Sequence, residues 1–184
     1  MNALLIILAV FTVVGILLYN TLIARKNQVE NVYGSLEALL KKRYDLIPNL
    51  VESAKRYMEF EKDILTEIVA LRTKAVATSN IGERMDLENR LSRLIKGLMI
   101  NIENYPQLKS DTHIMHLQRS LNEIEEQISA ARRAYNQAVT DYNNIIEMFP
   151  TNILANYMGY RKKEVFKIDE DEKNPPDIKT LFDR

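Results

Sequence analysis

The chain has 184 residues, which is the size of one ordinary domain, and its 46% hydrophobic and 27% charged residues exclude a disordered composition. Its 25 Lys and Arg balance 25 Asp and Glu, so the sequence lacks the basic surplus typical of nucleic-acid-binding proteins. The absence of cysteine excludes disulfides, thiol catalysis and cysteine–zinc sites. Only 5 Gly and 5 Pro interrupt the chain, which favours long helices over a strand-rich fold.

The N-terminus carries a continuous apolar stretch. No charged side chain precedes Arg25, and Ala3–Leu18 is almost wholly apolar. A helix of roughly 20 apolar residues crosses a hydrocarbon core about 30 Å thick. Tyr19 is suited to the membrane interface, and Arg25 and Lys26 supply a charged boundary. We therefore predict a transmembrane anchor over residues 1–25.

A cleaved signal peptide is the main alternative for this segment. It requires a basic start and a small-residue cleavage site, whereas only Met1 and Asn2 precede the apolar run and Thr21–Ala24 is a poor site.

The charged residues beside the anchor predict the orientation of this single-pass cell-membrane protein. The Lys and Arg residues near the anchor all follow it, and the positive-inside rule places such residues in the cytoplasm. The N-terminus would lie outside and the remaining chain in the cytoplasm.

Apolar residues then recur at a spacing of three and four, which is typical of helices packed in a bundle. Flanking apolar residues widen the stripe and favour three or four helices over a two-stranded coil. The first run is Val29, Tyr33, Leu36, Leu40, Arg43, Ile47, Leu50, Ala54, Tyr57, Glu61, Ile64, Ile68, Leu71 and Ala75.

Pro48 lies within this first run. Proline removes a backbone donor and kinks or breaks a helix, although Asp45 could instead cap a new helix with Pro48 in its first turn. Because the heptad phase does not slip across Pro48, we predict one long helix kinked near this residue.

A turn at residues 78–82 precedes a second helix, which should end before Pro106. Its expected apolar face comprises Leu87, Leu91, Leu94, Leu98 and Ile102. A third helix should begin near Asp111 or Thr112 and end at Phe149-Pro150. Its expected stripe is Ile114, Leu117, Leu121, Ile124, Ile128, Ala131, Tyr135, Ala138, Tyr142, Ile145 and Phe149.

A short final helix follows, which Thr151 could cap and Gly159 would close. The periodic pattern ends near Asp169. We therefore predict an all-α fold: the N-terminal transmembrane helix, an antiparallel bundle of three to four long helices over residues 26–166, and a mobile charged tail over residues 167–184.

Two polar features stand out within the apolar stripes. Arg43 needs a carboxylate partner on another helix or a path to solvent along its aliphatic stem. Tyr135-Asn136 and Tyr142-Asn143 repeat at seven residues, which places the tyrosines in one row and the asparagines in the next. We expect the rings to pack in the core while the hydroxyl and amide groups bind a neighbouring backbone or side chain; the alternative is a polar groove that recognises a peptide or helix.

Several blocks of the sequence, in this order, resemble the LemA family of bacterial membrane-anchored proteins. They are the anchor, Lys42–Val51, Glu103–Lys109, Leu117-Gln118, Ala131–Asn136, Tyr142-Asn143 and Phe149-Pro150. The resemblance spans roughly residues 1–166 and implies a helical bundle, an extracellular N-terminus and a cytoplasmic domain. It implies no chemistry or cofactor. Members are often encoded near a stress-type membrane zinc protease, which makes such a protease a candidate partner.

The candidate structural or interaction residues lie within these blocks. They are Arg43, Asp45, Pro48, Asn49, Arg132, Arg133, Tyr135, Asn136, Tyr142 and Asn143.

No catalytic set is evident in the sequence. His113 and His116 could offer two nitrogens to a metal, but no third ligand is evident, and histidines on the surface of a helix start are the simpler interpretation. No catalytic residue, metal or cofactor is predicted.

The leading hypothesis is a non-enzymatic membrane-anchored scaffold or adaptor that contacts the bilayer and a protein partner. The alternatives are a membrane-stress or envelope quality-control factor that works with a membrane protease, and a metal protein or enzyme that uses the histidines. Any apolar stripe left uncovered by the bundle would allow homo-oligomers.

Overall fold

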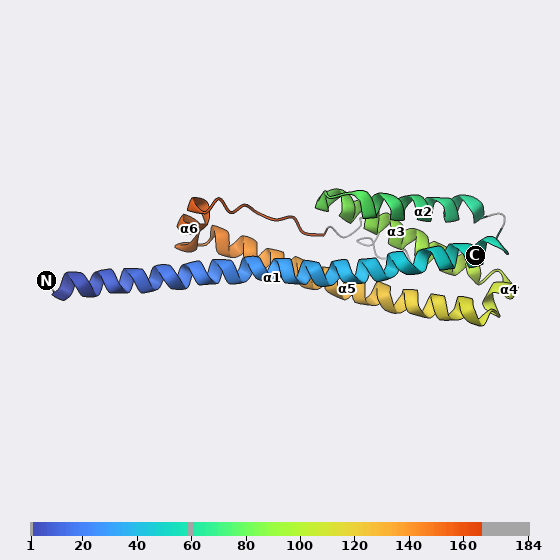
Figure 1. Ribbon diagram of the computed structural model, residues 1–184, viewed down its shortest axis with the longest axis horizontal. Coiled ribbons are helices and arrows are strands. Elements are labelled where there is room, and N and C mark those ends of the chain that lie inside the picture. Colours follow the sequence, from blue (N-terminus) through green and yellow to red (C-terminus); the bar gives the residue numbers. More distant parts are fainter. Residues whose placement is uncertain (1, 59–60, 167–184) are drawn as a thin grey trace, which may run out of the picture.

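The computed structural model describes residues 2–58 and 61–166, and these residues form a bundle of helices (Figure 1). The four long helices run antiparallel to their neighbours in sequence, α4 connects two of them, and α6 lies at one end of the bundle. The predicted all-α antiparallel bundle is thus confirmed. The helices are α1 (Asn2–Lys55), α2 (Lys62–Ala77), α3 (Ile81–Ile102), α4 (Pro106–Lys109), α5 (Thr112–Glu147) and α6 (Thr151–Tyr157).

Helix α1 is much longer than the bundle that it joins. Its 54 residues span about 80 Å at 1.5 Å per residue, and its N-terminal part projects beyond the other helices (Figure 1). The large apolar side chains from Leu4 to Leu17 are all exposed, and Leu22 is the first buried residue of the helix. Of the helices described, α1 alone is long and apolar enough to cross a membrane, and its apolar stretch is unburied.

The core has two parts, which share α1 and α5. The part nearer the projecting end of α1 joins the middle of α1 to the second half of α5, to α6 and to Phe166. The far part joins the last turns of α1 to α2, α3, α4 and the start of α5. Since α1 and α5 run through both parts, they hold the ends of the bundle together.

The first apolar run forms two helices, so the prediction that one helix spans the whole run is wrong. The predicted continuity of the helix through Pro48 is confirmed. Helix α1 ends at Lys55, α2 begins at Lys62, and Tyr57 is 41% exposed. An uninterrupted helix would have carried Glu61 on its apolar stripe. Folding back at this point instead lets α2 cover the stripe of α1. No Gly or Pro marks the break, and the heptad spacing continues across it.

Pro48 does not end α1, which is unbroken from Asn2 to Lys55. In a regular helix the Tyr44 carbonyl would accept a hydrogen bond from the residue 48 N–H, which proline lacks. Arg72 Nε of α2 donates to this carbonyl at 2.8 Å. A side chain from the neighbouring helix thus supplies the donor that Pro48 lacks, and Asp45 caps no new helix.

The ends of the shorter helices follow local sequence signals. Asn80 accepts the Glu83 N–H at the start of α3, and Asp111 accepts two N–H groups at the start of α5. Gly159 has a φ of +70° after α6. The Tyr160 N–H donates to the Ala155 carbonyl there, so the helix closes in a Schellman motif as predicted.

Two predictions at the α5–α6 junction are wrong. Thr151 does not cap α6; it is the first residue of the helix, and its hydroxyl donates to the Ile145 and Met148 carbonyls. Phe149, expected in the buried stripe, is 80% exposed. Helix α5 ends at Glu147, so its apolar face does not extend to Phe149.

Replacing Arg72 by Met should test the bond across Pro48. The substitution keeps much of the aliphatic stem but leaves the Tyr44 carbonyl without this donor, so we expect a loss of about 1–3 kcal/mol in the free energy of unfolding. In a Pro48→Ala background residue 48 regains its N–H, and the same substitution should cost less. Equal losses in the two backgrounds, measured by denaturant unfolding in detergent, would exclude this role for Arg72.

Candidate functional site

Arg43 is fully buried at the centre of the bundle, with no exposed surface. Its guanidinium forms ion pairs with Glu88 of α3, also fully buried, and with Glu125 of α5, at 2.6 Å from Nη1 to Oε1. A charged group in the core needs such partners, because desolvation would otherwise cost several kcal/mol. Of the two alternatives for Arg43, pairing with carboxylates on other helices is the one that the structure supports.

Hydroxyl groups extend this ion-pair network. Arg43 Nη1 donates to Ser92 Oγ at 2.7 Å, and Ser92 Oγ donates to Glu125 Oε2 at 2.9 Å. The Tyr44 hydroxyl donates to Glu88. Burial raises the pKa of the Tyr44 hydroxyl, an effect opposed in part by the charge of Arg43, so this group remains a protonated donor. The network therefore ties α1, α3 and α5 in one register.

Sequence reasoning missed Glu88, although a signal for it exists. The expected stripe of α3 ran through Leu94, whereas Ile95 is the buried residue. The stripe that includes Ile95 has an unbroken spacing of three and four: Glu88, Leu91, Ile95, Leu98 and Ile102. One acidic residue in this stripe and one basic residue in the stripe of α1 would have predicted the ion pair.

The paired Tyr-Asn repeats of α5 bind the chain that follows α6. Residues 160–166, which we call the strap, run back along α5 in the opposite direction. Asn143 donates to the Lys163 carbonyl and accepts its N–H, both at 2.9 Å. Asn136 does the same with Phe166, at 3.0 and 2.8 Å.

The spacing of the two asparagines explains this match. Seven helical residues rise about 10.5 Å, and three extended residues span about 10 Å, so amides seven apart on α5 meet backbone groups three apart on the strap. The tyrosine rings are buried, and their hydroxyls donate to strap carbonyls at 3.2 Å for Tyr142 and 3.4 Å for Tyr135. Burial raises the pKa of both hydroxyls, which keeps them protonated. The chain's own strap therefore fills the polar groove considered as a peptide site.

The other candidate residues contribute less to this arrangement. Arg132 lies over the Phe166 ring, 5.3 Å from its centroid, and donates to Asn89 Oδ1 at 2.9 Å. Arg133 is exposed and donates to Ser129 on its own helix. Three more candidates lie exposed on α1: Asp45, Pro48 and Asn49.

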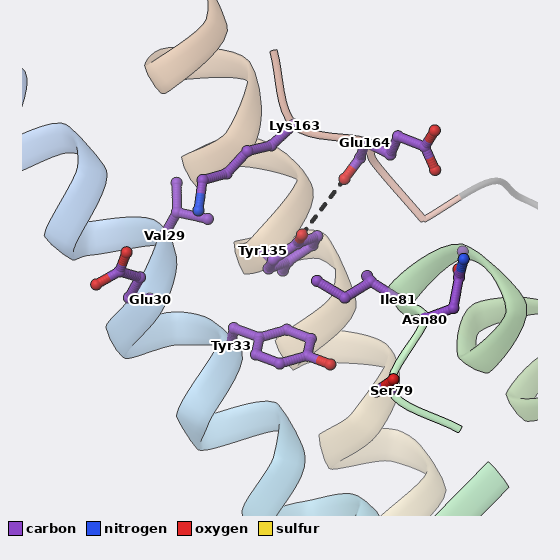
Figure 2. Close-up of a pocket in the computed structure, with 10 residues that line it drawn as sticks. Val29, Glu30, Tyr33, Ser79, Asn80, Ile81, Tyr135, Lys163 and Glu164 are labelled. Atoms are coloured by element: carbon purple, nitrogen blue, oxygen red, sulfur yellow. Dashed lines mark hydrogen bonds between the residues drawn. The ribbon is translucent and has the colours of Figure 1, made fainter. Parts of the chain in front are cut away.

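A cavity of about 560 Å³ lies beside the strap, where Tyr33 and Tyr135 face each other with ring centroids 5.7 Å apart (Figure 2). Its lining combines tyrosine, aliphatic and charged side chains, which could enclose a small amphipathic group but supply no paired nucleophile and base. The lining residues are Val29, Glu30, Tyr33, Ser79, Asn80, Ile81, Gly82, Tyr135, Lys163 and Glu164.

His113 and His116 both lie exposed in the first turns of α5. Over residues 2–58 and 61–166, no group of three or more His, Asp or Glu side chains is placed to hold a metal ion. A metal site at the two histidines therefore gains no support from the fold.

Removing the charge of Arg43 should destabilise the bundle strongly. Arg43→Met leaves Glu88 buried without its cation, so we expect a loss of about 3–5 kcal/mol in the free energy of unfolding. A second substitution, Glu88→Leu, should recover much of that loss. The control Lys42→Met, on the exposed surface, should change stability by less than about 0.5 kcal/mol. If Arg43→Met were as stable as this control in denaturant unfolding, the network would not hold the bundle.

Replacing Asn143 by Asp should release the strap. The carboxylate lacks the N–H that reaches the Lys163 carbonyl and repels that oxygen, so amide hydrogen exchange over residues 161–166 should accelerate. The matched control is Asn144→Asp, the same change at an exposed neighbour. Equal exchange rates in the two variants would show that Asn143 does not hold the strap.

The comparisons with known proteins confirm the resemblance to the LemA family. The family model described as the LemA family matches residues 33–180. Protein LemA of Metamycoplasma hominis is 26% identical over 166 residues, covering 88% of this chain and 74% of that protein. Magnetosome protein MamQ 2 of Paramagnetospirillum magneticum is 25% identical over 175 residues, covering 81% of this chain and 64% of that protein. With a family model that matches most of its length, the chain belongs to the LemA family.

Proposed function

We propose that this protein is a non-enzymatic, membrane-anchored scaffold that presents its helical bundle to protein partners. One observation carries the proposal: the apolar, exposed start of α1 and the helix that forms the bundle core are one unbroken helix. A continuous stretch of exposed apolar side chains is unfavourable in water and favourable in the hydrocarbon core of a bilayer.

The continuity of α1 determines how the bundle would be held. A flexible linker would let the bundle tumble, whereas a helix fixes its distance and direction relative to the bilayer. The ion-pair network on Arg43 extends that constraint to α3 and α5. We place the N-terminus outside and the bundle in the cytoplasm, because Arg25 and Lys26 follow the apolar stretch and no Lys or Arg precedes it.

A binding role rather than a catalytic one is supported by the chemistry of the described residues. The most deeply buried charges are Arg43 and Glu88, which bond to each other and to neighbouring side chains. The polar rows of α5 bind the strap. A partner would therefore bind the outer surface of the helices, where the apolar side chains of Val76 and Ile100 are exposed.

Site-specific crosslinking in native membranes tests this role. A photo-crosslinking residue at Val76 on α2 or Ile100 on α3 should yield discrete adducts with a partner protein or a second copy of the chain. A probe at Leu8, within the apolar stretch, serves as the matched control and should react with lipid. Failure of every bundle position to yield an adduct, at normal protein levels, would argue against a scaffold.

A further inference from the structure

The junction between α5 and α6 is uncharged and unusually exposed. Residues 148–159, which we call the corner, contain no Asp, Glu, Lys, Arg or His, in a chain with 27% charged residues. The corner exposes large apolar side chains to 58–89% of their surface. These are Met148, Phe149, Ile153 and Tyr157.

Exposed apolar side chains lie both on α6 and just before it. Ile153 and Tyr157 are one turn apart on α6 and so share a face, and Phe149 precedes the helix, while Thr151 and Ala155 of α6 are buried against the bundle. Helix α6 thus packs Leu154 and Ala155 against the bundle and leaves Ile153 and Tyr157 on the side turned away from it. Burying that side against the bundle would have been the ordinary way to remove it from water.

The corner lies at the end of the bundle from which the apolar part of α1 projects (Figure 1). Leu22, the first buried residue of α1, belongs to the same buried cluster as Ala155 of α6. Leu18, the last residue of the apolar run, precedes Leu22 by one turn, or about 6 Å along the helix. The headgroup layer on each side of a bilayer is roughly 5–8 Å thick, so a group level with Leu22 would fall within it if the hydrocarbon core ended at Leu18.

Charged side chains begin only farther into the bundle on each segment that reaches this end. The first on α1 is Arg25, which pairs with Asp141 of α5 at 3.2 Å. Glu147 precedes the corner and pairs with Lys162, which follows it, at 2.5 Å. These two ion pairs form a polar boundary between the rest of the bundle and its uncharged end, which consists of the corner and the part of α1 before Arg25. Tyr19 of α1, 47% exposed, lies on the uncharged side of that boundary with Phe149 and Tyr157.

We propose that the corner inserts into the headgroup region of the same bilayer that α1 crosses, as a second membrane contact. This inference rests on the proposed membrane anchorage. Aromatic side chains and a short amphipathic helix are the groups that partition into this layer. With two contacts, α1 and the corner, the bundle could neither tilt freely nor rotate about the axis of α1.

The chain contains no tryptophan, so a single introduced Trp reports on its own surroundings. Full-length variants Phe149→Trp and Tyr157→Trp would be reconstituted in lipid nanodiscs that carry brominated lipids, which quench Trp fluorescence on contact. Phe11→Trp reports on the anchor, and Met115→Trp, at an exposed position of α5 at the far end of the bundle, serves as the water control.

At both corner positions we expect the Trp emission to shift to the blue and to lose intensity. The loss of intensity should be strongest when the bromine atoms lie near the headgroups. Phe11→Trp should be quenched most by bromine near the bilayer centre, and Met115→Trp should be unaffected. If Phe11→Trp were quenched and the two corner variants were not, the corner contact would be refuted and the anchor would still be supported. Unquenched emission at Phe11→Trp would refute the anchor and the corner together. Blue-shifted but unquenched corner emission would assign the corner to a second copy or another protein.

Discussion

The fold of this chain depends on one constraint: a single unbroken helix, α1, carries two different surface patterns. The first turns of α1 expose apolar side chains on every face, whereas from Leu22 onward the helix buries one stripe and exposes polar residues. Water disfavours the first pattern and supports the second. The change occurs over little more than one turn, so the boundary between the apolar segment and the bundle is narrow. In the proposed anchorage, the bundle therefore begins beside the bilayer.

Buried polar groups then determine which arrangement the apolar stripes adopt. Leu and Ile stripes could pair in several registers, but Arg43 can meet Glu88 and Glu125 in only one. The Tyr44 carbonyl and Arg72 set the position of α2 in the same way. On α5, Asn136 and Asn143 bind the strap through backbone atoms, so its path depends on asparagine spacing more than on strap side chains.

Periodic patterns predicted most of the fold, because helix faces and caps are local properties. The apolar start of α1, the Asn80 turn, the start of α5 at Asp111 and the closure at Gly159 all follow from neighbours in sequence. The predictions that failed depend on distant partners. The turn after Lys55 exists because α2 covers α1, and Phe149 leaves the stripe because α5 ends two residues earlier. The strap was also missed, since its binding residues lie about 20–30 positions away.

Alkaline extraction of membranes from cells that make the full-length chain tests the central claim most directly. Anchorage through α1 predicts that the protein, with its N-terminus intact, stays in the membrane pellet after ultracentrifugation. A Leu8→Arg/Phe11→Arg variant should move towards the supernatant, because charges at the bilayer centre are costly. An intact, unaltered chain recovered in the supernatant would contradict the claim that lipid surrounds the start of α1.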